Sequence, residues 1–192
     1  MRKSFSLVAA VGVAATAIGL SLVAAAQAGT ATSAGAAEHM SLMSQKQTAA
    51  DHLPEFISAG TEVGELVAPA TTRRLGSSGA GTYWSGTDAN GELCLITVIG
   101  DTAADFVAGA SCAPPSDFPA KGVGLQVAGP PGASEAYLLP DGVPAAQLGE
   151  GYTVVSPNLV LSDPAAEPSE PRSVTGTRGT FTLSDLTPTP AQ

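Results

Sequence analysis

Short runs of alternating apolar and polar residues occupy the middle of this 192-residue chain, and turn-forming residues separate the runs. The most apolar run is 92–99, ELCLITVI. Successive side chains of a strand point to opposite sides, so Leu93 and Leu95 would lie on one face and Cys94 on the other. Both faces are apolar, which predicts a central strand that is covered on both sides.

Other runs have the length and the β-branched or aromatic residues of strands. They lie at 82–87, 106–112, 123–128, 135–140 and 152–161. The 22 Gly and 15 Pro residues, many of them between these runs, favour tight turns over long helices. We therefore predict an all-β domain over residues 51–161, a small antiparallel sandwich or partial barrel.

Two segments ahead of the first of these strands contain residues that are typical of a helix or of a turn. A short helical turn is predicted from Pro54, whose missing N–H is not needed at a helix start, to Gly60, which suits a helix end. The segment 76–81, GSSGAG, is interpreted as a flexible turn because Gly and Ser dominate it.

Residues 1–28 have the features of a signal peptide. A basic start precedes the apolar run 5–26, and Ala28 ends a small-residue A-x-A pattern before Gly29. Signal peptidase accepts small side chains at these positions, so cleavage is predicted between Ala28 and Gly29. The apolar run also reaches the ~20 residues that a membrane-spanning helix needs, so an uncleaved anchor is the alternative. Either arrangement places the rest of the chain outside the cytoplasm.

The segments on both sides of the predicted domain have the composition of linkers. Residues 29–50 are small and polar without a sustained hydrophobic period, which indicates a flexible spacer. Residues 162–192 are acidic and rich in Pro, as is typical of a linker and tail. Within them, the stretch 179–186, GTFTLSDL, could dock as one extra strand or stay loose.

The chain has few charges, and most of them are acidic. Charged residues make up 13%, and the net charge is −9. Without Arg2 and Lys3 at the N-terminus, 17 acidic and 6 basic residues remain, which gives −11. The remaining basic cluster, Arg73-Arg74, is too small a footprint for nucleic acid. We predict no nucleic-acid partner, and a membrane contact only if the N-terminal segment is not removed.

Cys94 and Cys112 are the two cysteines of the chain. The stretch midway between them, GDTAAD, has turn residues, and a hairpin there would place the cysteines opposite each other on neighbouring strands. Opposed residues lie close enough for a disulfide, which an oxidising compartment preserves. Zinc would need about two more Cys or His ligands. The histidines, His39 and His52, lie outside the predicted strands, so we predict a disulfide, no metal and no cofactor.

No pattern of residues makes a positive case for catalysis. The segments 76–81 and 109–113 resemble a nucleophile elbow but lack the G-x-S-x-G spacing. His52 is interpreted as a solvent-facing residue rather than a general base. Several carboxylates fall at predicted turns: Asp88, Glu92, Asp101, Asp105, Asp117 and Asp141. Turn chemistry alone explains them, so we predict no catalytic residue and keep a small extracellular hydrolase with a carboxylate site as the alternative.

Tyr83 and Trp84 are neighbours in the predicted strand 82–87, so their side chains point to opposite faces. A buried ring would anchor the core, whereas an exposed ring offers a flat apolar surface to a glycan or a peptide. Tyr83, Trp84 and Tyr137 are therefore candidate ligand contacts, with a core role as the alternative. The partner that we predict is an extracellular protein, peptide or glycan.

A set of segments resembles a group of uncharacterised actinobacterial proteins that are secreted or carry a single membrane anchor. The segments are DHLP, RRLGSSGAGTYWSGTDANGELCLITV, ASCAPPSDF, GVGLQV and EAYLLPDGV. The resemblance implies an extracytoplasmic β domain with one disulfide and brings no assigned activity. We therefore expect a secreted or cell-envelope-associated interaction module that is not catalytic. The alternatives are the hydrolase and the ectodomain of a single-pass membrane protein.

Overall fold

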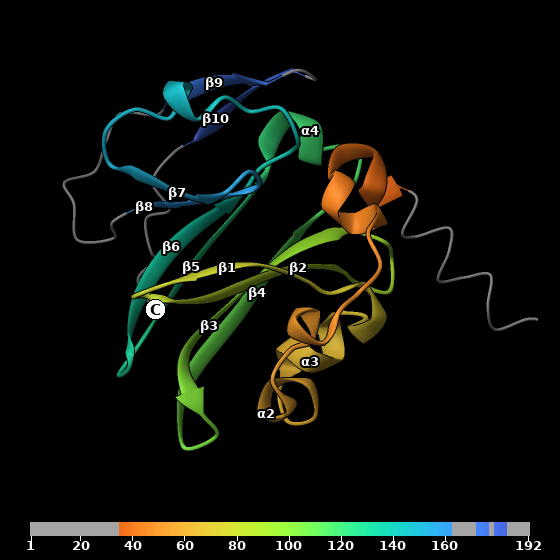
Figure 1. Ribbon diagram of the computed structural model, residues 1–192, viewed down its shortest axis with the longest axis vertical. Coiled ribbons are helices and arrows are strands. Elements are labelled where there is room, and N and C mark those ends of the chain that lie inside the picture. The colour runs from red at the N-terminus through yellow and green to blue at the C-terminus, as the bar shows by residue number, and fades with distance from the viewer. Residues whose placement is uncertain (1–34, 163–171, 177–178, 184–192) are drawn as a thin grey trace, which may run out of the picture.

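The computed structural model describes residues 35–162, 172–176 and 179–183, and these form mainly antiparallel β-sheets (Figure 1). There are two four-stranded sheets and a separate two-stranded hairpin. The predicted all-β fold is therefore confirmed. The predicted signal peptide and its cleavage site at Ala28 and Gly29 lie outside the described residues.

The first sheet has the strand order β1-β2-β3-β4. Its strands are β1 (Arg73–Ser78), β2 (Gly81–Thr87), β3 (Leu93–Thr102) and β4 (Asp105–Ala113). The central position of β3 is confirmed, because β2 and β4 pair with its two edges. Every residue from Leu93 to Ile99 is buried, as expected of a strand whose two faces are both covered.

Strand β1 contradicts the predicted flexible turn at 76–81. The strand continues to Ser78, and the turn consists of Gly79 and Ala80. A shift of register before Gly76 marks a bulge, and Gly76 has a φ of +152°, which glycine adopts without strain. Leu75 is the one large apolar side chain of this strand, which is too little alternation to predict a strand from sequence.

The second sheet has the strand order β5-β6-β8-β7. Its strands are β5 (Val123–Gly129), β6 (Gly132–Leu138), β7 (Tyr152–Ser156) and β8 (Leu159–Ser162). The short helix α4 (Phe118–Lys121) lies in the connection from the first sheet, and the 3-10 turn η4 (Ala145–Gln147) precedes β7. The predicted run 152–161 is therefore two strands that pair with each other.

The two sheets pack face to face around one apolar core. Tyr83 and Leu95 of the first sheet and Leu138 of the second are among its fully buried members. At the edges, small residues let neighbouring strands approach closely. A Cβ added to Gly109 of β4 would lie 2.8 Å from a methyl carbon of Val127 in β5. The structure is thus a sandwich that closes toward a barrel at its edges.

Residues 35–50 are not the flexible spacer that we predicted. Ala36, Met40 and Met43 are at most 4% exposed and belong to the core between the sheets. Their spacing of four and then three residues places them on one side of a helical segment. Three apolar residues, one of them alanine, are too few to stand out as a hydrophobic period among the small and polar residues of this segment. The sequence therefore did not predict that it packs in the core.

A helical layer covers the outer face of the first sheet (Figure 1). We define it as residues 53–67. Its helices are α2 (Glu55–Ser58) and α3 (Glu62–Leu66). Ile57 and Val67 pack against Trp84 on that face of the sheet. The predicted helical turn from Pro54 to Gly60 is thereby confirmed, and a second short helix follows it.

Polar contacts join the segment ahead of the helical layer to strand β1. The short turns here are η1 (Ser41–Ser44), η2 (Ala49–Asp51) and η3 (Pro69–Thr71). The buried Arg73 guanidinium donates to the carbonyl oxygens of Gln45 and Thr72. The amide of Gln47 donates to Thr72 Oγ1 over 2.9 Å.

Asp51 makes the last of these contacts, and its Oδ1 accepts a hydrogen bond of 2.9 Å from the backbone N–H of Arg74. Burial alone would raise the pKa of Asp51, but hydrogen bonds from Thr48 and Arg74 outweigh it and hold the pKa below its ordinary value. The N-terminal segment is therefore anchored to β1 by polar groups as well as by apolar packing.

A hairpin covers the outer face of the second sheet (Figure 1). It consists of β9 (Arg172–Gly176) and β10 (Gly179–Leu183), which pair with each other and with no strand of the two large sheets in the part of the chain described. Val174 and Leu183 are buried against Tyr137 and Val160. Of the stretch 179–186 that we left open, residues 179–183 therefore dock as one arm of a hairpin, and residues 184–186 lie outside the part described.

Candidate functional site

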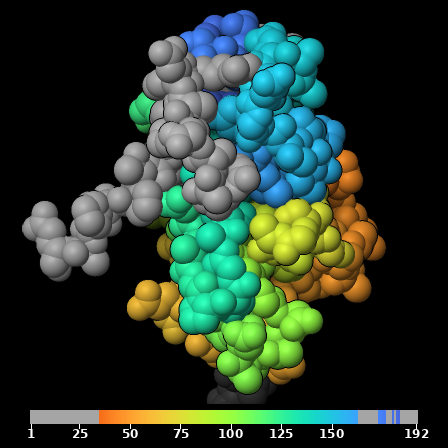
Figure 2. Space-filling model, turned by 90° about the vertical axis from the view of Figure 1, so that its left-hand side faces the viewer, coloured from red at the N-terminus to blue at the C-terminus, as the bar shows by residue number. Residues whose placement is uncertain are grey.

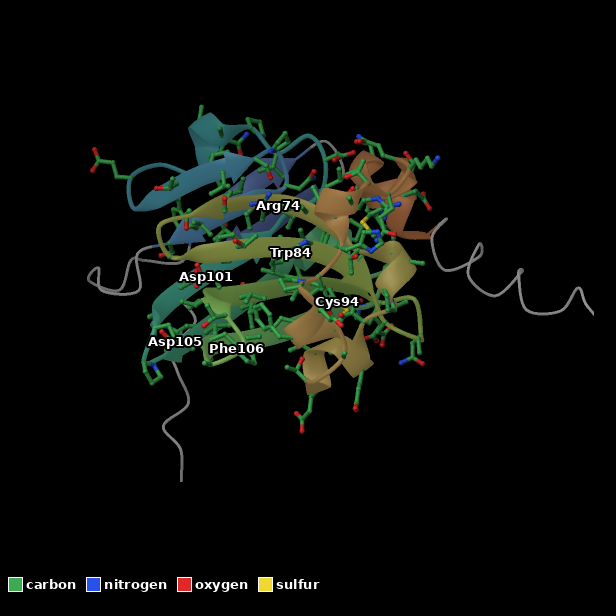
Figure 3. The ribbon with its side chains drawn as sticks, turned by 60° about the horizontal axis from the view of Figure 1, so that its bottom comes forward. Arg74, Trp84, Cys94, Asp101, Asp105 and Phe106 are labelled. Atoms are coloured by element: carbon green, nitrogen blue, oxygen red, sulfur yellow. A yellow bond between two sulfur atoms is a disulfide. The ribbon has the colours of Figure 1, made fainter. Side chains whose placement is uncertain are left out.

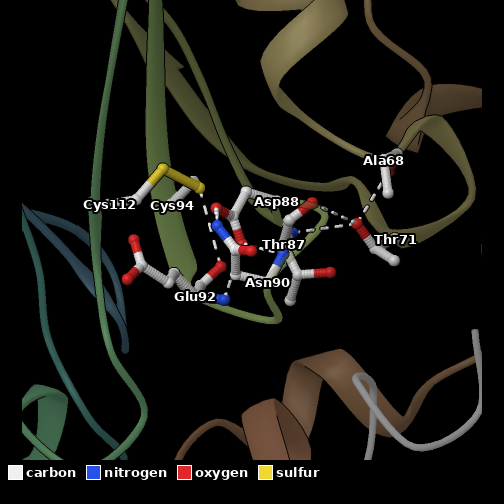
Figure 4. Close-up of a disulfide and its surroundings, with 8 residues drawn as sticks. All are labelled: Ala68, Thr71, Thr87, Asp88, Asn90, Glu92, Cys94 and Cys112. Carbon is white, nitrogen blue, oxygen red and sulfur yellow. Dashed lines mark hydrogen bonds between the residues drawn. A yellow bond between two sulfur atoms is a disulfide. The ribbon is translucent and has the colours of Figure 1, made fainter.

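The predicted disulfide is present: Cys94 and Cys112 are bonded across β3 and β4 (Figure 4). They are direct register partners, and their Cα atoms are 4.0 Å apart. Cys94 is fully buried and packs beneath the helical layer against Ile57. A disulfide of this kind indicates an oxidising, extracytoplasmic compartment.

The carboxylate of Asp88, in the turn that precedes the strand of Cys94, has a structural role. Asp88 accepts hydrogen bonds from the backbone N–H groups of Asn90 and Glu92, and from the Asn90 side chain (Figure 4). These contacts form the DANG turn between β2 and β3, with Gly91 at a φ of +80°. Asp88 is thus a turn residue, as the turn-forming residues around it predict.

The candidate ligand contacts Tyr83, Trp84 and Tyr137 are buried, with exposed fractions of 0%, 4% and 5%. Tyr83 and Trp84 do point to opposite faces, one into the core between the sheets and one beneath the helical layer. Because both faces of the sheet are covered, neither ring reaches solvent. All three rings are core residues, and none of them presents its face at the surface.

The residues considered for catalysis lie apart from one another. His52 is exposed, and it borders a small cavity beside Leu53 and Gly64 in the helical layer. Asp101 and Asp105 instead line a hollow at the tip of the β3–β4 hairpin, beside the β1–β2 turn. Figure 2 shows this end of the sandwich, where the yellow β1–β2 turn lies between the blue and green segments. Histidine and aspartate therefore do not form one site.

A shallow apolar hollow opens on the helical layer, and sequence analysis did not find it. Its lining residues are Glu55, Phe56, Ala59 and Gly60. We call it the α2 hollow. The ring of Phe56 contacts Phe106 of β4, with ring centroids 5.1 Å apart. Both rings are partly exposed, unlike the buried aromatics above.

No local pattern could have revealed this pair. Phe56 belongs to a four-residue helix, and Phe106 is the first apolar residue of an edge strand. Their contact joins segments far apart in the sequence. It forms because the helical layer lies over the disulfide-linked hairpin, which is a tertiary effect.

The carboxylates of the helical layer have no cationic partner among the described residues. Across residues 35–162, 172–176 and 179–183, one ion pair is present, which joins Lys121 to Asp117 over 2.7 Å. That hydrogen-bonded contact also lowers the pKa of Asp117. Glu55, Glu62 and Glu65 of the helical layer are exposed and make no such contact.

Metal binding and membrane insertion find no support in the residues described. No group of three or more Cys, His, Asp or Glu side chains gathers there in a way that could hold a metal ion. The helices of the same residues are all too short to cross a membrane. The alternative of an uncleaved membrane anchor at residues 1–28 lies outside the part of the chain described.

Comparisons with known proteins give no relative. No family model, no curated protein and no solved structure matches the chain. The resemblance to secreted actinobacterial proteins therefore stays a prediction, and the function has to be inferred from the surfaces of the molecule.

Proposed function

We propose that this protein is a secreted or cell-envelope-associated interaction module that binds a partner through the helical layer. The observation that carries this proposal is the partly exposed Phe56–Phe106 pair beside the α2 hollow. Phe56 lines the hollow and Phe106 contacts it from β4, and partly exposed aromatic side chains are typical anchor points for a partner. The rings lie on a rigid support, because the Cys94–Cys112 bond closes the hairpin that carries Phe106.

Site-specific crosslinking in the native organism tests this proposal. A photoreactive residue at Ala59 would lie in the α2 hollow, and one at Ala146, an exposed residue of η4, serves as the control. We expect a discrete crosslinked species from position 59 and none from position 146. Equal labelling at both positions, or none at either, would contradict a partner site on the helical layer.

The intact mass of the unreduced protein from medium and membrane fractions tests the compartment. A released species that begins at Gly29 and carries the disulfide fits a secreted module. A full-length species in the membrane would instead support the ectodomain of a single-pass protein, with the same hollow facing outward.

A small hydrolase is the second candidate. Asp101 and Asp105 both line the hollow at the tip of the β3–β4 hairpin, which has a volume of ≈ 420 Å³. This volume lies within the range of about 300–1,000 Å³ that is usual for ligand sites, and glycoside hydrolysis needs two carboxyl groups facing one bond. The test is release of reducing ends from cell-wall polysaccharide by the wild-type protein and by Asp101→Asn. Activity that disappears in the variant would establish the hydrolase and displace the module.

A further inference from the structure

We infer that the α2 hollow binds a cationic segment of an extracellular partner, with a Lys or Arg side chain seated on the Phe56–Phe106 pair. This inference rests on the proposed function, since it names the partner of the same surface. It follows from the charge, the chemistry and the rigidity of the hollow.

The surroundings of the hollow are negative and lack internal compensation. Glu55 lines it, and Glu62 and Glu65 are exposed on the same helical layer. Residues 75–120, which include all of β2, β3 and β4, contain no Lys or Arg. Exposed charges of one sign on the same small layer add their fields, which physiological salt screens over about 8–10 Å. The surface therefore attracts a cation and repels an anion.

The two basic residues of β1, Arg73 and Arg74, do not neutralise this surface. Arg73 is buried, and its guanidinium donors are used on backbone carbonyl oxygens. Arg74 is exposed on β1, whereas Phe106 lies on β4, so the two occupy opposite edges of the first sheet (Figure 3). The Arg74 guanidinium also donates to Ser77 Oγ on its own strand.

A Lys or Arg side chain matches both halves of the hollow. Its alkyl stem packs on apolar surface while its charged head stays at the rim. An aromatic ring attracts a cation through its quadrupole; Phe56 lines the hollow with Phe106 in contact behind it, and the Glu55 carboxylate is available for a charge-assisted hydrogen bond. A neutral or acidic side chain would use only the apolar half.

The hollow is already formed in the free protein. Ile57, next to Phe56, is fully buried against the sheet. At Gly64, α3 packs directly on the backbone of Ile57 and Ser58, where even a Cβ would overlap a carbonyl oxygen. The side chain of Thr61 caps α3 by accepting from the Gly64 N–H. Such preorganisation lowers the entropy cost of binding.

The test uses the full disulfide-bonded protein and short fluorescent peptides that alternate Ser with Lys, Gln or Glu. We expect the Lys peptide to bind, the affinity to fall with added salt, and the Gln and Glu peptides to bind at least about tenfold more weakly. Equal binding of the Lys and Gln peptides would overturn the inference, because the charge would then have no role.

Matched variants locate the binding. Glu55→Gln and Glu150→Gln remove the same charge from two exposed sites, one in the hollow and one in the turn before β7. We expect Glu55→Gln to weaken the Lys peptide about tenfold and Glu150→Gln to leave it unchanged. Equal weakening by both variants would mean diffuse attraction to an acidic protein and would overturn the site.

Phe56→Leu separates the ring from the charge. It keeps an apolar side chain, and its thermal unfolding checks that the helical layer stays folded. Weaker binding of the Lys peptide by the folded variant supports the cation–π contact, whereas unchanged binding contradicts it. If position 59 crosslinks a partner but no Lys peptide binds, the inference of a cationic partner fails while the proposed interaction module stands. If position 59 gives no crosslink and no Lys peptide binds, the inference and the proposed function both fail.

Discussion

The two large sheets are each covered on the outer face, but the two covers are attached differently. The helical layer combines buried apolar residues such as Ile57 with neighbouring polar anchors from Gln47 and Asp51 to the β1 region. The β9–β10 hairpin buries Val174 and Leu183 and adds a hydrogen bond from the Thr175 N–H to the side chain of Gln147.

This difference indicates that the helical layer unfolds together with the domain, whereas the β9–β10 hairpin can open alone. A two-stranded hairpin is marginally stable by itself, and elements with few buried contacts open locally before the whole protein unfolds. The helical layer instead lies over the disulfide and is continuous with β1. A binding surface that must stay in shape is therefore better placed on the helical layer.

Breaking the apolar anchor of the helical layer should have the largest effect. Ile57 is fully buried, so Ile57→Ala leaves a cavity and should lower the free energy of unfolding by about 2–5 kcal/mol. Urea denaturation measures it. Leu66→Ala is the matched control on the same layer: Leu66 is 44% exposed, and its loss should change stability by less than about 0.5 kcal/mol. Equal effects would contradict the packing described.

Removing the disulfide should cost somewhat less. The paired substitutions Cys94→Ala and Cys112→Ala open a loop with a sequence separation of 18 residues. In the chain-entropy treatment this lowers the free energy of unfolding by about 3 kcal/mol. Guanidinium denaturation of the oxidised wild type and the double variant gives the difference. A loss well under 1 kcal/mol would show that the strand pairing of β3 and β4 needs no covalent link.

Weakening the second cover should have a smaller global effect. Leu183→Ala undocks the β9–β10 hairpin, and its cost is limited to the free energy of docking, which we expect to be at most about 2 kcal/mol. Hydrogen exchange should show lost protection in β9 and β10 and near-normal protection in β6 and β8. Loss of protection throughout both sheets would mean that the hairpin belongs to the cooperative core.

Acid should weaken the polar anchor of the helical layer by the smallest amount. Because the folded-state pKa of Asp51 lies below its ordinary value of 3.8, its contribution is complete above that pH. It is lost as the pH falls below 3.8 through the folded-state value. Asp51 is partly exposed to solvent, so we expect under about 1 kcal/mol. Denaturation curves of wild type and Asp51→Asn should converge toward low pH, and parallel curves would contradict this.

Local alternation predicted the parts of the fold in which neighbouring residues decide the structure. The apolar run through Cys94 identified the central strand, and the turn residues midway to Cys112 identified the hairpin and the disulfide. Both features depend on residues close together in sequence. The Gly/Ser-rich strand β1 and the short apolar pattern of Ala36 and Met40 had too few large side chains to be recognised.

The candidate site could not be predicted because it depends on which surfaces are covered. The adjacent rings of Tyr83 and Trp84 suggested one exposed aromatic, yet the helical layer buries one and the second sheet buries the other. The rings that do reach the surface, Phe56 and Phe106, meet only after the layer docks. A sequence pattern describes one strand or helix at a time, and the hollow belongs to two.

The contact between Gly76 and Val155 also bears on the order in which the strands of the domain come together during folding. A Cβ on Gly76 would lie 2.6 Å from Val155 Cγ1, so a side chain of β7 packs directly on β1 at this glycine, although the two strands belong to different sheets. β7 follows β1 by most of the domain, and such distant contacts form late in folding. The Cys94–Cys112 hairpin, whose strands are close in sequence, is therefore expected to form before β7 packs against β1.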